Sequence, residues 1–250
     1  MNREQVKKRM NGLPALLFWT AIWQLVAWAV ANPLLLPGPV QVLICLAELA
    51  GTATFWQSVA VSIGRIALGV GCAVALGVLL AAASAASGAV EMLISPAMTA
   101  MQATPVASFT ILVLIWLDRD YVPVLICGMM ALPVIYGSVG AGIRTTDPQL
   151  LEMAKVFRLS WHLRLRRIWI PSVKPFFRTA CSSALGLGWK AGIAAEVLTV
   201  PRRSIGRMIS ESKLYLLTEE LFAWTLTVIL LSLLLQKLML RLLNGRKDHA

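Results

Sequence analysis

The feature that most constrains this chain is a series of long apolar runs, separated by short segments that hold most of the charge. Several runs approach or exceed the roughly 20 residues that an α-helix needs to cross a bilayer. Of the 250 residues, 58% are hydrophobic and only 14% are charged. The mean hydropathy of +0.74 lies outside the range of ordinary soluble domains. The sequence therefore predicts an all-α integral membrane protein with about six transmembrane helices.

The spans are placed by the apolar runs, and a Pro-rich break after the first run leads into a short interfacial helix near 40–51. The predicted spans are 13–31, 59–83, 103–117, 122–143, 175–200 and 221–243. The third is short, and an earlier start within 91–101 is an alternative, with Pro96 and Pro105 as interruptions. The chain then divides into an N-terminal span with an external segment (1–58), a core of five spans (59–243) and a cytoplasmic tail (244–250).

The basic residues indicate how these spans are oriented. Lys and Arg gather at the N-terminus, between residues 144 and 178, and at the C-terminus, as the positive-inside rule expects of cytoplasmic segments. We therefore expect both termini inside, and we attribute the net charge of +11 to the membrane rather than to a nucleic-acid partner. An amphipathic element on the outer surface would account for four basic residues that fall outside: Arg202, Arg203, Arg207 and Lys213.

The first apolar run raises a question of targeting. Four basic residues within 3–9 precede it, and it closes with Ala29-Val30-Ala31, a pattern that a signal peptidase could cut. The run is longer than a typical signal core, and the rest of the chain is itself apolar. We therefore expect an uncleaved first span.

The fifth predicted span carries a ridge of small residues at four-residue spacing, which lets helix backbones approach closely inside lipid. The ridge comprises Ala180, Ala184, Gly188 and Gly192, and Glu196 continues it. A shorter ladder on the second span comprises Ala67, Gly71 and Ala75. Such a ridge fits ordinary packing within one subunit, and it equally fits a dimer interface or the wall of a pathway.

Ionisable residues in the spans are few, and such groups usually face protein or water. Lys190 and Glu196 are six residues apart on the fifth span, about 120° around a helix, so they are not expected to pair with each other. Arg65 lies near the start of the second span. We expect its side chain to snorkel to the lipid headgroups.

Residues suited to chemistry are scarce. The four cysteines lie far apart and only two histidines occur, so no metal site is predicted. The sequence has no Gly-x-x-x-x-Gly-Lys-Ser/Thr phosphate loop, so this chain is not expected to hydrolyse ATP. An intramembrane enzyme is an alternative of a different class. Ser182 and Ser183 would be its candidate nucleophiles, but no His lies within a span to activate them.

The loop from Arg144 to Arg178 holds eight Lys and Arg against two acids. Asp147 and Pro148 predict a helix start, with Asp as N-cap and Pro at the first helical position. An apolar stripe at helical spacing follows, through Leu150, Met153, Ala154, Phe157 and Trp161. Ser160 is expected to cap a second short helix that Pro171 ends. The helix-turn-helix would be a docking surface or a pair that binds only lipid headgroups.

The same loop resembles the EAA loop of ABC transporter permeases, whose pattern is Glu-Ala-Ala, three residues, Gly, nine residues and Ile-x-Leu-Pro. Glu152-Met153-Ala154 and Ile168-Trp169-Ile170-Pro171 match this pattern at the expected distance. Three further segments resemble the nitrate, sulfonate and taurine import permeases: ILVLIWL, TTDPQLLEMAKVF and ALGLGWKAGIAAEVL. The resemblance extends from about 59 to 243.

The resemblance implies a type I ABC importer permease fold, with cytoplasmic coupling helices, in a bacterial inner membrane. Two copies of the chain would form the pathway for a small sulfonate-, nitrate- or taurine-like solute or a related metabolite. Two ATPase subunits would bind and hydrolyse ATP with Mg, and an extracytoplasmic binding protein would deliver the solute. This chain would be no enzyme and would bind no cofactor itself. The transmembrane component of an energy-coupling-factor vitamin transporter is the runner-up, although its Ala-Arg-Gly signatures are absent.

By this resemblance, the EAA loop couples the ATPase to the spans. Glu152 would meet a basic group of the ATPase, and Met153, Ala154 and Phe157 would fill its cleft. Ile168 and Pro171 complete the motif. Pathway or dimer-interface groups would come from the fifth span: Thr179, Ser182, Ser183, Gly188, Gly192 and Glu196. The hydroxyl groups among them indicate no preference for the charge of the solute.

Two positions depart from the family pattern, because Arg158 stands at the usual Gly and Ile170 at the usual Leu. The Gly is expected to end the helix in a left-handed conformation, which a residue with a Cβ adopts at a cost of roughly 1 kcal/mol. Arg158 therefore predicts a strained or reshaped turn, or an added contact to the partner.

Overall fold

The computed structural model describes residues 12–244, which are almost entirely helical, with no strand in that range. The basic N-terminal cluster and the tail from residue 245 lie outside the described residues. The helices in the first half are α2 (Gly12–Val30), α3 (Pro39–Ala50), α4 (Ala53–Ala86), α5 (Gly88–Ala103) and α6 (Val106–Val113). The second half holds α7 (Val122–Arg144), α8 (Pro148–Val156), α9 (Trp161–Arg164), a π-helical segment η1 (Leu165–Trp169), α10 (Ile170–Thr199), α11 (Ile205–Leu214) and α12 (Thr218–Asn244).

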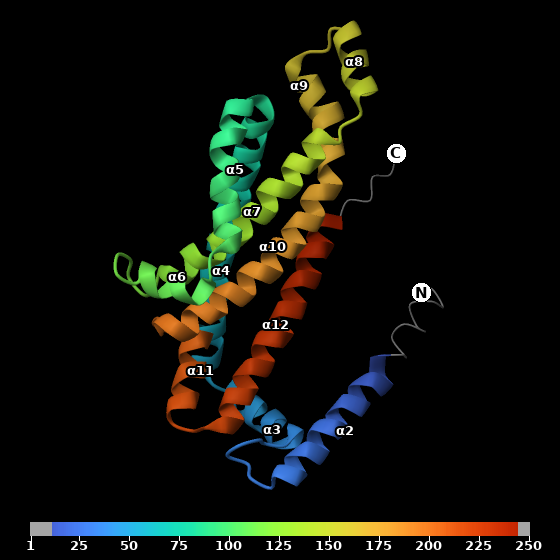
Figure 1. The fold of residues 1–250 in the computed structure, drawn as a ribbon. Coiled ribbons are helices and arrows are strands. Elements are labelled where there is room, and N and C mark those ends of the chain that lie inside the picture. Colours follow the sequence, from blue (N-terminus) through green and yellow to red (C-terminus); the bar gives the residue numbers. More distant parts are fainter. Residues whose placement is uncertain (1–11, 245–250) are drawn as a thin grey trace.

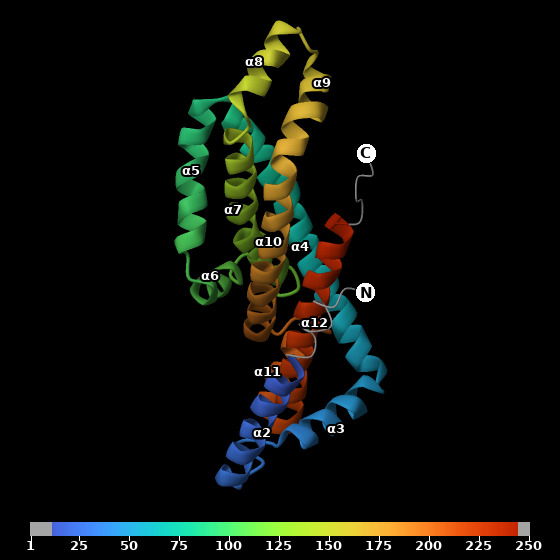
Figure 2. The same ribbon diagram turned by 90° about the vertical axis from the view of Figure 1, so that its right-hand side faces the viewer.

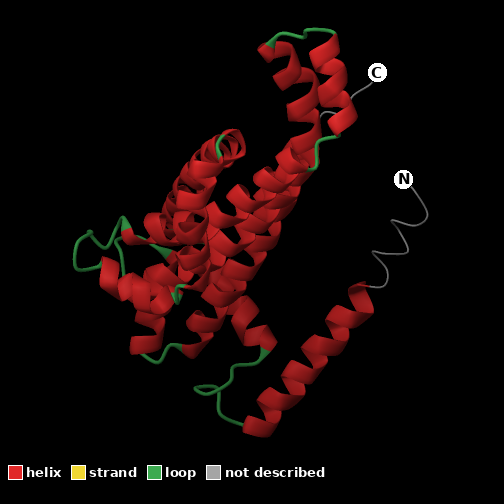
Figure 3. Cartoon of the chain, turned by 45° about the horizontal axis from the view of Figure 1, so that its top comes forward, coloured by secondary structure: helices red, strands yellow, loops and turns green. Residues whose placement is uncertain are grey.

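The helices form an elongated bundle whose two ends differ (Figures 1 and 2). The hairpin of α8 and α9 stands at one end, and α3 and α11 lie at the other. Short loops join the helices throughout (Figure 3). Helix α2 stands at the side, where Trp23 stacks on Phe222 of α12 and donates from its indole N–H to the Pro37 carbonyl. The predicted interfacial helix near 40–51 corresponds to α3.

The core lies where α7 packs between α4 and α10. Glycines permit this close contact. A Cβ added at Gly69 of α4 would collide with the Val124 backbone and the Cys127 sulfur of α7. Added Cβ atoms at Gly188 and Gly192 of α10 would lie 2.7 Å from Val70 and 2.8 Å from Ile66 of α4, respectively. The small-residue ridge of α10 therefore packs inside one chain.

Among the described helices, α4, α7 and α12 are long and apolar enough to cross a membrane. They contain the predicted spans 59–83, 122–143 and 221–243. Helix α10 contains the predicted span 175–200 except its last residue, and it packs against all three of these helices. The all-helical membrane class is thereby confirmed, whereas the count of about six spans stays a prediction.

The prediction of a third span over 103–117 is wrong. The chain forms α5, with Pro96 inside it, and then breaks at Thr104 before the eight-residue α6. The cause is Pro105, which lacks an N–H and disfavours helical geometry in the residue before it. Thr104 is accordingly extended, with ψ 124°. The alternative start within 91–101 lies inside α5.

The expectation that Pro171 ends a short helix is also wrong, because α9, η1 and α10 form one uninterrupted helix. Arg164 and Trp169, at the two junctions, both have right-handed helical geometry. Pro171 cannot donate a hydrogen bond within a helix, and its ring would clash with the preceding turn. The π-helical turn at Leu165–Trp169 widens the helix just before it, and the Ile170 N–H donates to the Leu165 carbonyl.

The packing of α10 generates a test. Gly188→Leu should lower the free energy of unfolding by about 2 kcal/mol or more, because the side chain must displace Val70 and the Cys127 backbone. Gly137→Leu is the control, since nothing lies within 4 Å of a Cβ added there. Thermal melting in detergent would measure both. Equal melting temperatures for the two variants would contradict the packing described above.

Candidate functional site: an exposed hairpin at one end and a buried polar cluster at the other

The start of α8 is fixed by its own sequence. The Asp147 carboxylate accepts a hydrogen bond from the Gln149 N–H at 2.8 Å, and Pro148 occupies the first helical position. This is the predicted N-cap, and it satisfies one of the free N–H groups of the first turn. Just before it, the buried Thr146 hydroxyl donates to the Gly142 carbonyl of α7. The hairpin therefore begins at a defined point at the end of α7.

The end of α8 adopts the left-handed turn that the sequence predicts at Arg158, where φ is 48°. The Arg158 N–H donates to the Lys155 carbonyl at 3.0 Å and the Leu159 N–H to the Ala154 carbonyl at 2.9 Å. This pair of bonds is a Schellman cap, which normally uses Gly at the left-handed position. The Arg164 Nε donates to the Leu159 carbonyl at 2.8 Å and ties the turn to α9.

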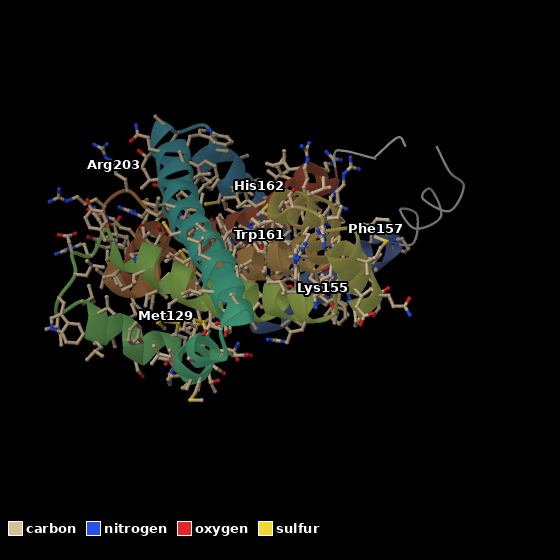
Figure 4. All side chains as sticks on the ribbon, turned by 90° about the horizontal axis from the view of Figure 1, so that it is seen from above. Met129, Lys155, Phe157, Trp161, His162 and Arg203 are labelled. Atoms are coloured by element: carbon tan, nitrogen blue, oxygen red, sulfur yellow. The ribbon has the colours of Figure 1, made fainter. Side chains whose placement is uncertain are left out.

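The outer face of α8 exposes apolar side chains. Val156 is 78% exposed and Phe157 71% exposed, and Met153 is exposed beside them. Glu152 is exposed as well, whereas Ala154 is fully buried. In Figure 4, viewed from this end of the molecule, Phe157 and Lys155 lie apart from Trp161 and His162 of α9. An apolar patch next to a carboxylate, on a hairpin beyond the rest of the bundle, is suited to docking another protein.

The predicted apolar stripe is divided by the turn. Trp161 belongs to α9 and lines a groove of about 500 Å³ together with Trp169, Phe177 and the end of α4. The stripe was expected to include Trp161, but the left-handed Arg158 redirects the chain before that residue. Of the remaining motif residues, Ile168 is buried in η1, and Pro171 is exposed near the start of α10.

A buried polar cluster joins four elements at the opposite end of the bundle. The Glu196 side chain of α10 is completely buried, and its Oε2 accepts hydrogen bonds from the Ser62 hydroxyl at 2.7 Å and the Gly206 N–H at 3.2 Å. Ser62 Oγ in turn accepts from the Ile205 N–H at 2.9 Å. Arg65 Nη1 lies 3.8 Å from Glu196 Oε1 and supplies the opposite charge.

The expectation that the Arg65 side chain snorkels to the lipid headgroups is wrong, because its guanidinium binds groups of its own chain. Its Nη2 donates to Asp120 Oδ1 at 2.7 Å and to the Arg202 carbonyl at 3.1 Å. The Arg202 N–H also donates to Asp120 Oδ1. The Arg65 guanidinium of α4 therefore holds two segments against α4: the turn just before α7 and the turn after α10. Sequence analysis missed this cluster, although Arg65, Asp120 and Glu196 were each visible as charges at the ends of apolar runs.

The predicted pathway or interface residues divide between two faces of α10. Gly188, Gly192 and Glu196 are buried against their own chain, so they present no surface to a partner. This favours packing within the subunit. Thr179 and Ser183 are exposed and Ser182 is half-buried.

Helix α11 is the amphipathic element expected near the basic residues of this end. Ile205 is buried, and Met208 and Ile209 pack against the main core, whereas Lys213 is exposed. Arg207 forms an ion pair with Glu211 one turn later at 2.6 Å.

These features define an integral membrane protein with an exposed helical hairpin at one end, and comparison with known proteins supplies its class. Residues 73–246 match the family model of the binding-protein-dependent transport system inner membrane component, and the chain belongs to that family. It is therefore a membrane permease of a solute import system. Its relatives are transport permeases rather than enzymes.

Three relatives represent the family. The chain is 28% identical to the taurine transport system permease protein of Escherichia coli (strain K12), over 97% of this chain and 89% of that one. It is 27% identical to a putative aliphatic sulfonates transport permease protein of Bacillus subtilis (strain 168), over 89% and 84%. It is 25% identical to the nitrate import permease protein of Synechococcus elongatus (strain ATCC 33912 / PCC 7942 / FACHB-805), over 71% and 67%.

The left-handed turn at Arg158 provides a test of backbone strain. Arg158→Gly should raise the free energy of unfolding by about 1 kcal/mol, because Gly adopts this conformation without a Cβ clash. Thermal melting of the purified chain would measure the gain. If the variant instead loses binding to its partner subunit, then the Arg158 side chain makes a specific contact there.

The buried cluster provides a test by double-mutant cycle. Arg65→Met should lower the free energy of unfolding by about 3 kcal/mol, because it leaves the Glu196 carboxylate buried without its cation. Adding Glu196→Gln should recover part of that loss, since the uncompensated charge is then removed. Arg207→Ala breaks a partly exposed pair and should cost less than about 1 kcal/mol. Strictly additive effects at Arg65 and Glu196 would refute the coupling.

Proposed function

We propose that this chain is the permease subunit of an ATP-driven importer and that α8 docks a separate ATPase subunit. The observation that carries the proposal is the exposed apolar group of Met153, Val156 and Phe157 beside Glu152. An apolar patch of this kind marks a surface that another protein or a membrane can cover. The match to the binding-protein-dependent family supports an ATPase as that partner and a binding protein on the other side.

The continuous helix from Trp161 to Thr199 gives this docking a mechanical consequence. The bond from Arg164 to the Leu159 carbonyl holds the turn between α8 and α9, and η1 passes into α10 without a break. A displacement of α8 by the ATPase is therefore transferred to α10 as a movement of one rigid element. Because α10 packs against α4 and α7, the three helices would move together.

The same proposal sets the orientation of the chain. The segment 144–178, which contains the α8–α9 hairpin, holds eight Lys and Arg against two acids. It would face the cytoplasm, together with both termini, in a bacterial inner membrane. Successive helices α2, α4, α5, α7, α10 and α12 reverse direction along the bundle, and α2 and α5 each extend along only part of its length (Figure 1). This reversal supports six crossings. Helix α10 is less apolar than its neighbours, yet it lies among them and would cross the same layer.

Two copies would enclose the pathway, and the solute would be small. The three relatives compared above are described as permeases for aliphatic sulfonates, taurine and nitrate, which are compact molecules with acidic oxygen groups. We propose a solute of this size, delivered by an extracytoplasmic binding protein. ATP and Mg would be bound by the ATPase alone, so this chain would need no cofactor.

Reversing the charge of α8 tests the docking role. Glu152→Lys should abolish solute-stimulated ATP hydrolysis and reduce uptake at least tenfold, because it removes the carboxylate expected to meet a basic group of the ATPase. Membrane insertion should be unchanged, since Glu152 is exposed. Glu48→Lys, the same change on exposed α3 at the other end, is the matched control. Undiminished uptake by Glu152→Lys, or labelling of a cysteine at position 156 only from outside the cell, would refute the proposal.

A further inference from the structure

One charged side chain of the bundle has an unusual position. Lys190 is exposed, although it lies well inside α10 and its neighbours Trp189 and Ala191 are buried. No hydrogen bond or ion pair to Lys190 occurs within residues 12–244. The two other charges that line this region, Arg65 and Glu196, compensate one another at the outer end. Lys190 is therefore a cation that has no hydrogen-bond or ion-pair partner among the described residues of its own chain.

The depth of Lys190 along the membrane-spanning helices follows from the contacts of the two residues before it. The Trp189 indole N–H donates to the Val228 carbonyl of α12 at 3.2 Å, and Gly188 packs on Val70 of α4. Val228 and Val70 both lie well inside apolar helices that are long enough to cross a membrane. From Lys190 to the end of α10 near Val200 the helix rises about 15 Å. The four-carbon stem of Lys is too short to carry its ammonium over that distance.

The exposed face around Lys190 carries small and polar side chains together with one leucine. Thr179, Ser183 and Ala194 share that face, at intervals of four, seven and four residues, and Leu187, 47% exposed, lies three residues before Lys190 on the same side. On one flank lies α12, where Gln236 donates to the Ser232 hydroxyl. A Cβ added at Gly186 of α10 would lie 3.2 Å from Gln236 Nε2, so this amide borders the same face.

The other flank is closed by α6. Ala191 and Ala195 of α10 belong to a small buried cluster with Val113 of α6 and two residues at the start of α7. The open face is thus a strip between α6 and α12, opposite the part of α10 that packs on α4 and α7. Hydrocarbon cannot solvate an ammonium, and a charge at the centre of a span costs about 3 kcal/mol even by permissive scales.

We propose that this strip of α10 lines the water-filled pathway between two copies of the chain and that Lys190 attracts small anions into it. This inference rests on the function proposed above and assigns to Lys190 the preference of the pathway for anionic over cationic solutes. Two-fold symmetry would bring one Lys190 from each copy to the axis. The Ser183 hydroxyl would offer a hydrogen bond along the way toward the cytoplasm, whereas the Thr179 hydroxyl already donates to the Pro175 carbonyl at 3.2 Å.

The chemistry of the strip suits passage rather than tight capture. A Lys ammonium is a compact, strongly hydrated charge with three rotatable donors, whereas Arg would bind an oxyanion in a fixed bidentate geometry. Conduction needs attraction that is strong enough for entry and weak enough for release. Pairing with a carboxylate of the second copy would remove the charge. The one carboxylate in α10, Glu196, is completely buried in its own chain and cannot serve.

Charged thiol reagents test this inference without knowledge of the natural solute. The importer complex would carry Ala194→Cys, with Cys45, Cys72, Cys127 and Cys181 replaced by Ala, in phosphatidylcholine liposomes. Anionic and cationic methanethiosulfonates would be supplied on both sides, with and without ATP. We expect Cys at 194 to react, and to react faster with the anionic reagent. Lys190→Met should reduce this preference roughly fivefold or more, and Lys190→Glu should invert it.

Two controls make the result specific. Lys190→Arg should retain the preference for the anionic reagent, and Lys237→Met, which removes another exposed cation on α12, should leave it unchanged. A cysteine at the fully buried position 195 should react with neither reagent.

Three outcomes would count against the inference. If Cys at 194 reacts only after unfolding in detergent, the strip faces lipid or protein, and the pathway assignment is overturned. If the preference is the same with Lys, Met and Glu at position 190, the role of the charge is overturned. In both cases retained ATPase activity of the complex would leave the proposed function standing. If the chain assembles with no ATPase at all, both proposals fall together.

Discussion

The close approach of α10 to α4 and α7 is the contact on which the other features of this molecule depend. Helices in lipid gain little from the hydrophobic effect and associate through close packing, which small residues permit. Gly69 on α4 and Gly188 and Gly192 on α10 stand where a side chain would collide with the neighbouring helix. These three helices consequently form one packed unit, and it fixes which surfaces of α10 remain open.

Helix α10 connects the two ends of the bundle. Its N-terminal extension through η1 carries the α8–α9 hairpin, and its C-terminal turn carries Glu196 into the buried cluster with Ser62. The Arg65 guanidinium then fixes the same end to Asp120 at the start of α7. A hydrogen-bonded buried charge tolerates little displacement, because breaking it leaves an uncompensated group in an apolar environment. Movement imposed at the hairpin would therefore move this end of the unit as a body rather than separate its helices.

The sequence predicted the local features well and the long-range ones poorly, for physical reasons. The Asp147 cap and the left-handed turn at Arg158 depend on residues within one or two turns of each other, so a motif contains all the information. Arg65 and Asp120 are 55 residues apart, and no periodicity reveals that they meet. Pro171 was expected to end a helix, because the widened turn that accommodates it has no signature of its own in the sequence.

The two faces of α10 were inseparable in the sequence, because small residues suit intrachain packing and contact between copies equally. In the structure the ridge through Gly188 and Gly192 packs within one chain. A second copy would therefore have to meet α10 on the face opposite this ridge. That side carries Lys190, and a cation excludes a dry, lipid-like contact there. By contrast, Gly71 on α4 is exposed, with nothing within 4 Å of an added Cβ. Its ladder remains available for close contact between copies, while the Lys190 strip is suited to water and solute.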